Sequence, residues 1–467
     1  MLFNSWHFVV FLLVVLSVCA WLPRYQRPWK VFIILASCYF YGQWSWKYLS
    51  LIFFTATLDF FIAQKLQTVL KPAKLIAVSV TVNLVVLAFF KYANFVITSI
   101  NDTVDWAGFV PTLTVLDIVL PVGISFYTFQ NMSYTIDVYR GNLSPRKSIL
   151  DYWTFSTFFP QLLAGPIVRA SEFFGQLDHP NPIVWRNLQY GLVLITAGYL
   201  KKVVLADNLA TSVEQVFGNA AAAGPWESLL AVYAFAFQIY FDFSGYTDIA
   251  IGIALLFGFE FPKNFDYPYL STSFQEFWRR WHMTLSRWLR DYLYISLGGN
   301  RHGLSRTTAN LMITMLLGGL WHGASWNFVV WGGLHGAYLA IERFALSKLA
   351  WWNSNSVFAR LTRFFIVFHL ICFAWIFFRA QSFATSIQII DNISRIFYER
   401  PTILKHGSLA LLLAVLLLAH WVMSSSRLKE RLARANALVF GAFVAVVALA
   451  LIWFTPAQSV PFIYFQF

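Results

Sequence analysis

Charged residues are scarce in this sequence, making up 12% of 467 residues, about half the share found in an ordinary soluble domain. Cysteine is scarce as well, and Cys19, Cys38 and Cys372 all lie in apolar stretches without a CxxC or Cys/His cluster. Disulfides, a structural zinc site and any other metal site are therefore not expected. The sequence also has no glycine-rich phosphate loop, no internal repeat and no low-complexity linker.

Apolar and aromatic residues are abundant instead, at 58% and 19% of the chain. A soluble globule of this length could not cover so much apolar surface, and disorder requires low hydrophobicity. The apolar runs are long and unbroken, unlike the short alternating segments of an outer-membrane barrel. The composition predicts an all-α polytopic membrane protein, and the lack of a linker predicts a single domain over residues 1–467.

A membrane span needs roughly 20 apolar residues. The stretches that approach this length are residues 8–22, 31–47, 49–64, 75–91, 113–136, 188–206, 228–258, 364–378, 408–424 and 437–454. The first lacks a basic segment before it and a small-residue cleavage site after it, so we interpret it as a retained span rather than a signal peptide. Basic loops lie on the cytoplasmic side of membrane proteins, and their positions here predict that both termini are periplasmic.

Two segments do not fit the pattern of simple spans. Residues 151–170 are apolar but contain Pro160, Gly165 and Pro166, which predicts a re-entrant or interfacial segment. Residues 261–306 carry too many basic residues to cross a bilayer and are predicted to lie at the cytoplasmic face. The net charge of +13 therefore indicates contact with anionic membrane lipid, or with an anionic cytosolic donor, rather than with nucleic acid.

Residues 274–292 fit an amphipathic helix. At about 100° per residue, His282, Leu285 and Leu289 fall within about 40° of Trp278. The opposite face carries the basic residues Arg279, Arg280, Arg287 and Arg290. These arginines either face lipid headgroups in an interfacial helix or bind the phosphates of a donor, while His282 is predicted to be buried.

Residues 307–341 predict a broken hairpin that enters the membrane and returns. Two short apolar stretches flank the motif WHGASW (321–326), and basic residues lie before and after the pair. This geometry places His322 near the apex, where a histidine is costly and by default suggests function. The alternative is a packing role for His322 through a carbonyl, and for His335 that packing role is favoured.

Several long blocks carry a family resemblance. They include QIYFDFSGYTDIAIGIALLFGF (238–259), NFDYPYLSTSFQEFWRRWHMTLSRWLRDYLYISLGGNR (264–301) and LLGGLWHGASWNFVVWGGLHG (316–336). Earlier blocks are LPVGISFYTFQNMSYTIDVYRG (120–141) and FFPQLLAGPIVRASEFF (158–174). In this order, the blocks resemble the membrane-bound O-acyltransferases (MBOAT), specifically the alginate O-acetyltransferase-like bacterial branch. The core motif region spans about residues 120–380, and further spans and a tail occupy residues 408–467.

The resemblance implies a helical bundle around a central tunnel, with re-entrant and interfacial helices. It implies that His322 is catalytic and that His282 is the second functional histidine. It further implies a bacterial inner-membrane enzyme that passes an acetyl group outward to alginate, cellulose or peptidoglycan. The expected partners are periplasmic or membrane-anchored acetyl-transfer proteins of the SGNH (Ser-His-Asp) type. A more distant branch handles D-alanine for teichoic acids.

The tail motif PFIYFQF (461–467) resembles the end of the small accessory peptide of the D-alanylation system, where a tyrosine is proposed to carry the acyl group. The matching residue here is Tyr464. The topology derived from charge independently places this tail outside, where an acyl relay is needed. Tyr464 is thus either an acyl relay or part of an aromatic tail docked into the bundle.

The resemblance also implies a mechanism. It makes acetyl-CoA or another acyl thioester the expected donor substrate, with no permanently bound cofactor, and the donor's phosphates could meet Lys263 or the four arginines. His322 acts as general base, while Trp321, Asp242 and His335 line the pocket. The competing hypotheses are a transporter, a non-catalytic scaffold for a periplasmic acetyltransferase, and D-alanyl transfer; the lack of internal repeats argues against the transporter.

Overall fold

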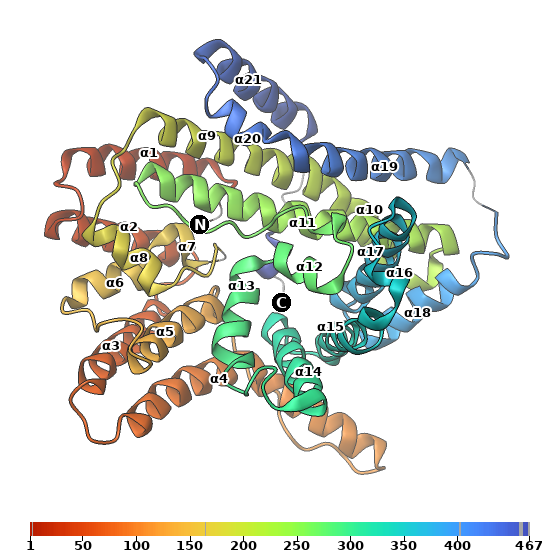
Figure 1. Cartoon of the computed structure of the whole chain (residues 1–467), viewed down its shortest axis with the longest axis horizontal. Helices are drawn as coiled ribbons and strands as arrows, with labels where there is room; N and C mark the ends of the chain where they lie inside the picture. The colour runs from red at the N-terminus through yellow and green to blue at the C-terminus, as the bar shows by residue number, and fades with distance from the viewer. Residues whose placement is uncertain (2, 164, 401–402, 457–460, 466–467) are drawn as a thin grey trace. The chain divides into compact units, whose positions relative to one another are not determined.

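The structure is a computed structural model that describes residues 1, 3–163, 165–400, 403–456 and 461–465. Within these ranges every regular element is a helix, as the composition predicts (Figure 1). Contacts between Cα positions divide the chain into two compact units, Met1–Gly191 with Ile253–Pro262, and Leu192–Gly252 with Lys263–Phe467. The single domain predicted from the sequence stays a prediction.

The prediction of a multi-pass membrane protein is confirmed by the length and apolarity of the helices. Seven helical stretches within the described ranges are long and apolar enough to cross a membrane: Leu49–Leu66, Pro72–Trp106, Trp185–Phe217, Pro225–Leu256, Val357–Arg379, His406–Ser426 and Ala437–Phe454. The first predicted span forms the shorter apolar helix α1 (Trp6–Trp21).

The first unit consists mainly of α1 and the helices α2 (Arg27–Gly42), α3 (Leu49–Leu66), α4 (Pro72–Trp106), α5 (Ile124–Tyr139), α6 (Ile149–Thr157), α7 (Phe159–Leu162) and α8 (Ala170–Asp178). Helices α3, α4 and α5 pack against one another, and α2 packs against α6. The predicted re-entrant segment 151–170 contains part of α6 and all of α7, and neither helix is long enough to span a bilayer.

The predicted span 113–136 is wrong in its first half, because residues 113–123 form no helix and α5 begins only at Ile124. Two asparagines of α4 hold this non-helical segment. Asn94 exchanges two side-chain hydrogen bonds of 2.9 Å with the backbone of Leu116, and Asn101 does the same for Leu113 at 2.8 and 3.3 Å. The asparagine amides thus bond backbone groups that would bond one another in a helix. Hydropathy alone does not reveal such bonds.

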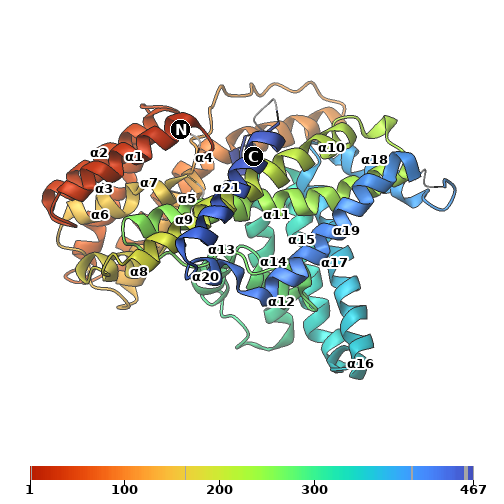
Figure 2. The same cartoon turned by 90° about the horizontal axis from the view of Figure 1, so that it is seen from above.

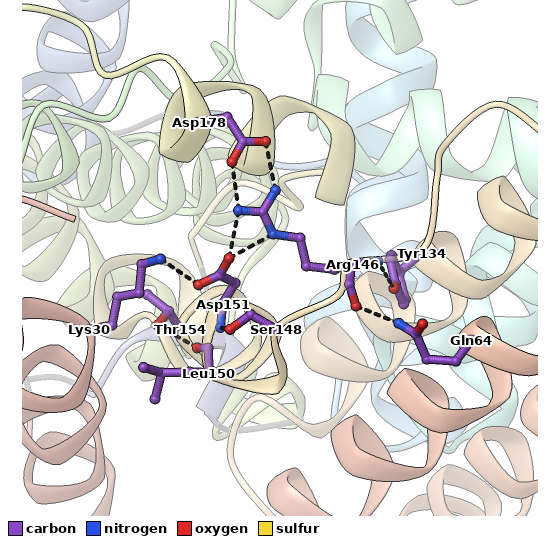
Figure 3. Close-up of polar contacts among 9 residues, drawn as sticks. All are labelled: Lys30, Gln64, Tyr134, Arg146, Ser148, Leu150, Asp151, Thr154 and Asp178. Atoms are coloured by element: carbon purple, nitrogen blue, oxygen red, sulfur yellow. Dashed lines mark hydrogen bonds and ion pairs between the residues drawn. The ribbon is translucent and has the colours of Figure 1, made fainter. Parts of the chain in front are cut away.

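Four charged side chains, from α2, the loop after α5, α6 and α8, meet in the first unit (Figure 3). Asp151 accepts hydrogen bonds from Lys30 Nζ at 2.5 Å and Arg146 Nε at 2.8 Å, and the Arg146 guanidinium also makes two bonds of 2.6 Å to Asp178. Gln64, near the end of α3, donates to the Arg146 carbonyl at 2.5 Å. The charge pattern predicts that the loops beside Lys30, Gln64 and Arg146 lie on one side of the membrane, and these contacts bring the three residues together within the first unit.

The second unit contains the end of α9 (Trp185–Tyr199) and its continuation as the π-helix η1 (Leu200–Ala206). The other helices are α10 (Asp207–Phe217), α11 (Pro225–Leu256), α12 (Phe274–Arg280), α13 (Met283–Trp288), the π-helix η4 (Leu289–Tyr294), α14 (Gly303–His322), α15 (Trp326–Phe344), α16 (Ala350–Asn353), α17 (Val357–Arg379), α18 (Phe383–Ser394), α19 (Ile403–Ser426), α20 (Leu428–Leu432) and α21 (Ala437–Phe454).

Helix α11 and the α9–η1 helix lie side by side in both views (Figures 1 and 2). They approach at two facing glycines: a Cβ on Gly198 would lie 2.7 Å from the carbonyl oxygen of Gly245, and one on Gly245 would lie 2.8 Å from that of Gly198. This close approach brings Lys201 and Lys202 of η1 to two carboxylates of α11, Asp248 and Asp242, respectively.

Candidate active site

The predicted histidine hairpin is present, formed by α14 and α15 (Figure 1). The two helices approach closely through glycines: a Cβ on Gly319 would overlap the carbonyl of Phe328, and one on Gly332 would overlap that of Met315. His322 is the last residue of α14, beside the turn, and is 3% exposed. The WHG motif therefore places an imidazole at a buried helix end.

The predicted continuous helix over residues 274–292 is wrong, because the chain breaks between α12 and α13. His282 stands at the break in the left-handed conformation, with φ 41°. The preceding loop forms backbone hydrogen bonds across it, from Asp266 N to the Arg280 carbonyl at 2.9 Å and from Met283 N to the Asn264 carbonyl at 2.8 Å. A non-glycine residue in this conformation is uncommon and points to a constrained site.

The side chain of Asn264 fixes the tautomer of His282. Asn264 Oδ1 accepts hydrogen bonds from the backbone N–H and the hydroxyl of Thr284, at 3.2 and 2.9 Å, so this atom is the amide oxygen. His282 Nδ1 lies 3.1 Å from the same oxygen and must therefore be the protonated nitrogen. Its lone pair is consequently on Nε2, which is buried and has no hydrogen-bond partner among the described residues.

His282 is fully buried, as its position on the apolar face predicts. Burial lowers its pKa to about 3 because an imidazolium is poorly solvated in an apolar surrounding. At neutral pH the ring is therefore uncharged, and Nε2 can accept a proton or a hydrogen bond.

The two histidines and Tyr464 lie together. The His282 and His322 ring centroids are 6.4 Å apart, and the Tyr464 ring lies 5.6 Å from that of His322 and 6.4 Å from that of His282. Trp321 contacts both imidazoles, with centroid distances of 5.9 and 5.0 Å. The rings of Phe243, Trp331 and Phe378 complete this aromatic shell.

The tail motif reaches this cluster through the described residues 461–465, while its last two residues, 466–467, lie outside the described ranges. The backbone N–H of Ile463 donates to Asp242 Oδ2 at 2.8 Å. The Tyr464 ring packs on that of Phe243, with centroids 4.3 Å apart. Asp242 therefore contacts the tail backbone rather than an open pocket.

His335 is linked to the pair through an indole: its ring and that of His322 both contact Trp331, with centroid distances of 4.6 and 5.1 Å. It is fully buried between Trp331, Trp278 and Phe277. The structure thus surrounds His335 with aromatic rings, while neither ring nitrogen has a hydrogen-bond partner among the described residues, and its role stays a prediction.

The predicted phosphate-binding residues do not form one unpaired cluster. Arg280 pairs with Glu276 at 2.9 Å, Arg290 with Asp291 at 2.6 Å and Lys263 with Asp266 at 2.6 Å. Arg279 is exposed and Arg287 half-buried. In the described part of the chain, no group of three or more His, Cys, Asp or Glu residues could hold a metal ion.

Two features of the site were missed by sequence analysis. Asn264 belongs to a block that carries the family resemblance, but only the folded loop shows that it orients His282. Lys202 pairs with Asp242 at 2.8 Å, and the one available signal was a pair of lysines inside an otherwise apolar stretch.

Comparisons with known proteins bear on the same region. The profile of the membrane-bound O-acyltransferase (MBOAT) family matches residues 38–386. A probable alginate O-acetylase of Pseudomonas aeruginosa is 40% identical over 363 residues, covering 76% of this chain and 68% of that protein. A peptidoglycan O-acetyltransferase of Helicobacter pylori is 38% identical over 393 residues, covering 78% and 73%.

A more distant relative is a teichoic acid D-alanyltransferase of Bacillus subtilis, 25% identical over 286 residues, covering 56% of this chain and 69% of that protein. Both histidines of the cluster lie inside the range matched by the family profile. The tail that carries Tyr464 lies beyond it.

Proposed function

Because this chain belongs to the membrane-bound O-acyltransferase family, we propose that it passes an acetyl group from a cytoplasmic donor across the bacterial inner membrane for O-acetylation of an exported polysaccharide. Family membership makes the chain a multi-pass membrane O-acyltransferase. The names of the two nearer relatives favour acetate as the group transferred and an alginate- or peptidoglycan-type polymer as the final acceptor.

The observation that carries the proposal is the meeting of His282, His322 and Tyr464 in one aromatic cluster. Two imidazoles and a phenol come from three separate segments of the sequence, and the two histidines and the Tyr464 hydroxyl are buried, away from the water that would hydrolyse a reactive thioester. A pure scaffold gives no reason to bring these three groups together.

In the proposed reaction, His322 takes the proton of the acceptor hydroxyl, that of Tyr464 or of a partner serine. The oxygen attacks the thioester carbonyl, a C–O bond forms, the C–S bond breaks, and the thiolate leaves and takes up a proton. His282 presents a neutral Nε2 to the donor or to the acceptor hydroxyl. Tyr464 then carries the acetyl group as an ester to the outer side, where an SGNH-type partner accepts it.

Acetyl-CoA is the proposed donor, and it acts as a substrate rather than as a resident cofactor. Its phosphates are anionic and suit guanidinium groups on α12 and α13. Arg279 is the best placed of these, because it is exposed and makes no ion pair with the residues that the structure describes. Lys263, Arg280 and Arg290 would first have to exchange their present carboxylate partners.

The test is the O-acetyl content of the envelope polysaccharide in a deletion strain complemented with wild-type protein or with His322→Ala. His369→Ala is a matched control, since His369 is exposed on α17 and hydrogen-bonds to the Phe365 carbonyl. We expect wild type and His369→Ala to restore acetylation and His322→Ala to fail at equal membrane level. Equal acetylation by all three would favour the scaffold or transporter.

D-alanyl transfer is the second candidate, favoured by the similarity to the teichoic acid D-alanyltransferase. Alkaline release of the ester-linked group from the acceptor separates the two. Acetate would support the proposal, and D-alanine would replace it with the alternative.

A further inference from the structure

One face of α11 holds the tail. Asp242 accepts the Ile463 N–H at 2.8 Å. Phe462 stacks on Tyr246 with ring centroids 4.3 Å apart and planes 20° apart, while Tyr464 packs on Phe243. The three α11 residues lie within about one helical turn, so they form a single binding surface for the tail.

The carboxylate at the centre of this surface belongs to a buried ionic group. Lys202 Nζ lies 2.8 Å from Asp242 Oδ1 and 2.7 Å from Asp207 Oδ1. All three residues are at most 3% exposed. Two carboxylates and one ammonium leave a formal charge of −1, and buried charge is costly unless hydrogen bonds satisfy it. The tail amide supplies such a bond to the second oxygen of Asp242.

We propose that Lys202, Asp207 and Asp242 form a latch that binds the peptide backbone of the tail at residue 463 and thereby sets Tyr464 between the two histidines. Asp242 is a positioning residue in this scheme, since it contacts the tail and not the reacting atoms. An effect of the latch on acetyl transfer rests on the proposed relay role of Tyr464, whereas the docking of the tail does not.

The binding is built so that a tail can also leave. It uses a main-chain hydrogen bond to Asp242 and ring contacts of Phe462, Tyr464 and Phe465, while the ion pairs of Lys202 are complete without it. A tail that carries an acyl group outward must undock at least partly, and a single charge-assisted hydrogen bond is a contact that can break reversibly.

A second ionic group on the same helix offers a matched control. Asp248 binds Lys201 at 2.8 Å and Lys429 at 2.6 Å, which attaches α20 to α11. Its side chain is 13% exposed, and its carboxylate is held by these two lysines rather than by the tail. A change at Asp248 therefore disturbs a charged group of α11 without removing the bond to Ile463.

The experiment measures tail docking directly. Phe465→Cys is introduced into full-length protein in which Cys19, Cys38 and Cys372 are replaced by serine, and its labelling rate with a soluble maleimide is followed in detergent. We expect Asp242→Ala and Ile463→Pro to raise the rate about tenfold, since each removes one partner of a charge-assisted hydrogen bond. Asp248→Asn and Ile463→Val, which keep that bond, should label at the rate of the parent.

Ile463→Pro removes the N–H, together with the isoleucine side chain, and leaves the buried charges intact, so it keeps the test valid if Asp242→Ala fails to fold. Unchanged labelling in Ile463→Pro would overturn the latch. O-acetylation measured on the same variants separates the two proposals. Fast labelling with wild-type acetylation would support the latch and refute the relay, while fast labelling with lost acetylation would support both.

Discussion

At the scale of single residues, His282 shows how the backbone serves the chemistry. Its left-handed φ of 41° ends α12 and turns the imidazole toward His322 and Tyr464. Such a conformation costs of order 1–3 kcal/mol. Asn264 offsets part of this cost, because its amide oxygen bonds both the ring and the next turn.

We expect Asn264→Ala to lower O-acetylation about tenfold or more at an unchanged protein level, because small misplacement of a reacting group is costly. Asn264→Asp retains an acceptor oxygen at the same place and should recover part of the activity. Acetyl release from purified polysaccharide, normalised to membrane protein by immunoblot, measures both. Full activity in Asn264→Ala would show that His282 needs no oriented tautomer.

At Tyr464 the packing of the ring can be tested separately from the reactivity of the hydroxyl. Tyr464→Phe keeps the ring contacts with Phe243 and both histidines but removes the hydroxyl. If Tyr464 is an acyl relay, the variant should lose acetylation entirely. If Tyr464 only docks the tail, the variant should retain the wild-type rate. Tyr398→Phe, at a side chain that is 91% exposed, controls for the loss of one phenol.

The sequence predicted the central residues of this site but not the residues that position them. His282, His322, Trp321 and Tyr464 come from motifs, and the structure places them together. Asn264 and Lys202 act through partners 18 and 40 positions away in the chain, Asn264 on His282 and Lys202 on Asp242. No local pattern encodes such pairings, so only the fold reveals them.

At the scale of elements, helical periodicity predicted which residues are buried better than it predicted whether the helix is continuous. An assumed helix over residues 274–292 placed Trp278, His282 and Leu285 on one apolar face, and all three are buried although the helix is broken. Hydropathy failed at residues 113–123, where the side chains of Asn94 and Asn101 bond the backbone of a non-helical segment. Apolar content alone does not distinguish such a segment from a helix.

The hairpin of α14 and α15 gives a prediction about packing. A Cβ at Gly332 would overlap the Met315 carbonyl, whereas one at Gly333 would make ordinary contact with Leu316 at 3.7 Å. Gly332→Ala should therefore destabilise the protein by about 1–3 kcal/mol, as overpacking does, and displace His322. Gly333→Ala should leave stability close to wild type.

Thermal unfolding of both variants in detergent, together with their acetylation activity, tests this expectation. A lower Tm and weaker activity in Gly332→Ala alone would locate the cause in the helix contact. Equal behaviour of the two variants would mean that the helices do not need to approach through Gly332.

At the scale of the whole molecule, membrane orientation connects the sequence pattern to the proposed direction of transfer. Asp151 pairs with Lys30 and Arg146, and Gln64 donates to the Arg146 carbonyl, so the start of α2, the end of α3 and the loop after α5 meet within the first unit (Figure 3). The loops at this place are the basic ones of the sequence, and basic loops are expected on the cytoplasmic side. We therefore expect the segment after α4, and the N-terminus before α1, on the periplasmic side.

Single cysteines in a cysteine-free background test that orientation at three exposed positions, Thr68, Gly108 and Asn142. An impermeant maleimide applied to cells with a permeabilised outer membrane should label position 108 at once. Positions 68 and 142 should react only after the inner membrane is opened, because they follow α3 and α5 beside the Arg146 cluster. Labelling of 68 and 142 from outside would invert the orientation, and the acetyl group would then have to travel from the opposite face. Different labelling of 68 and 142 would instead contradict the common side that the cluster at Asp151 requires.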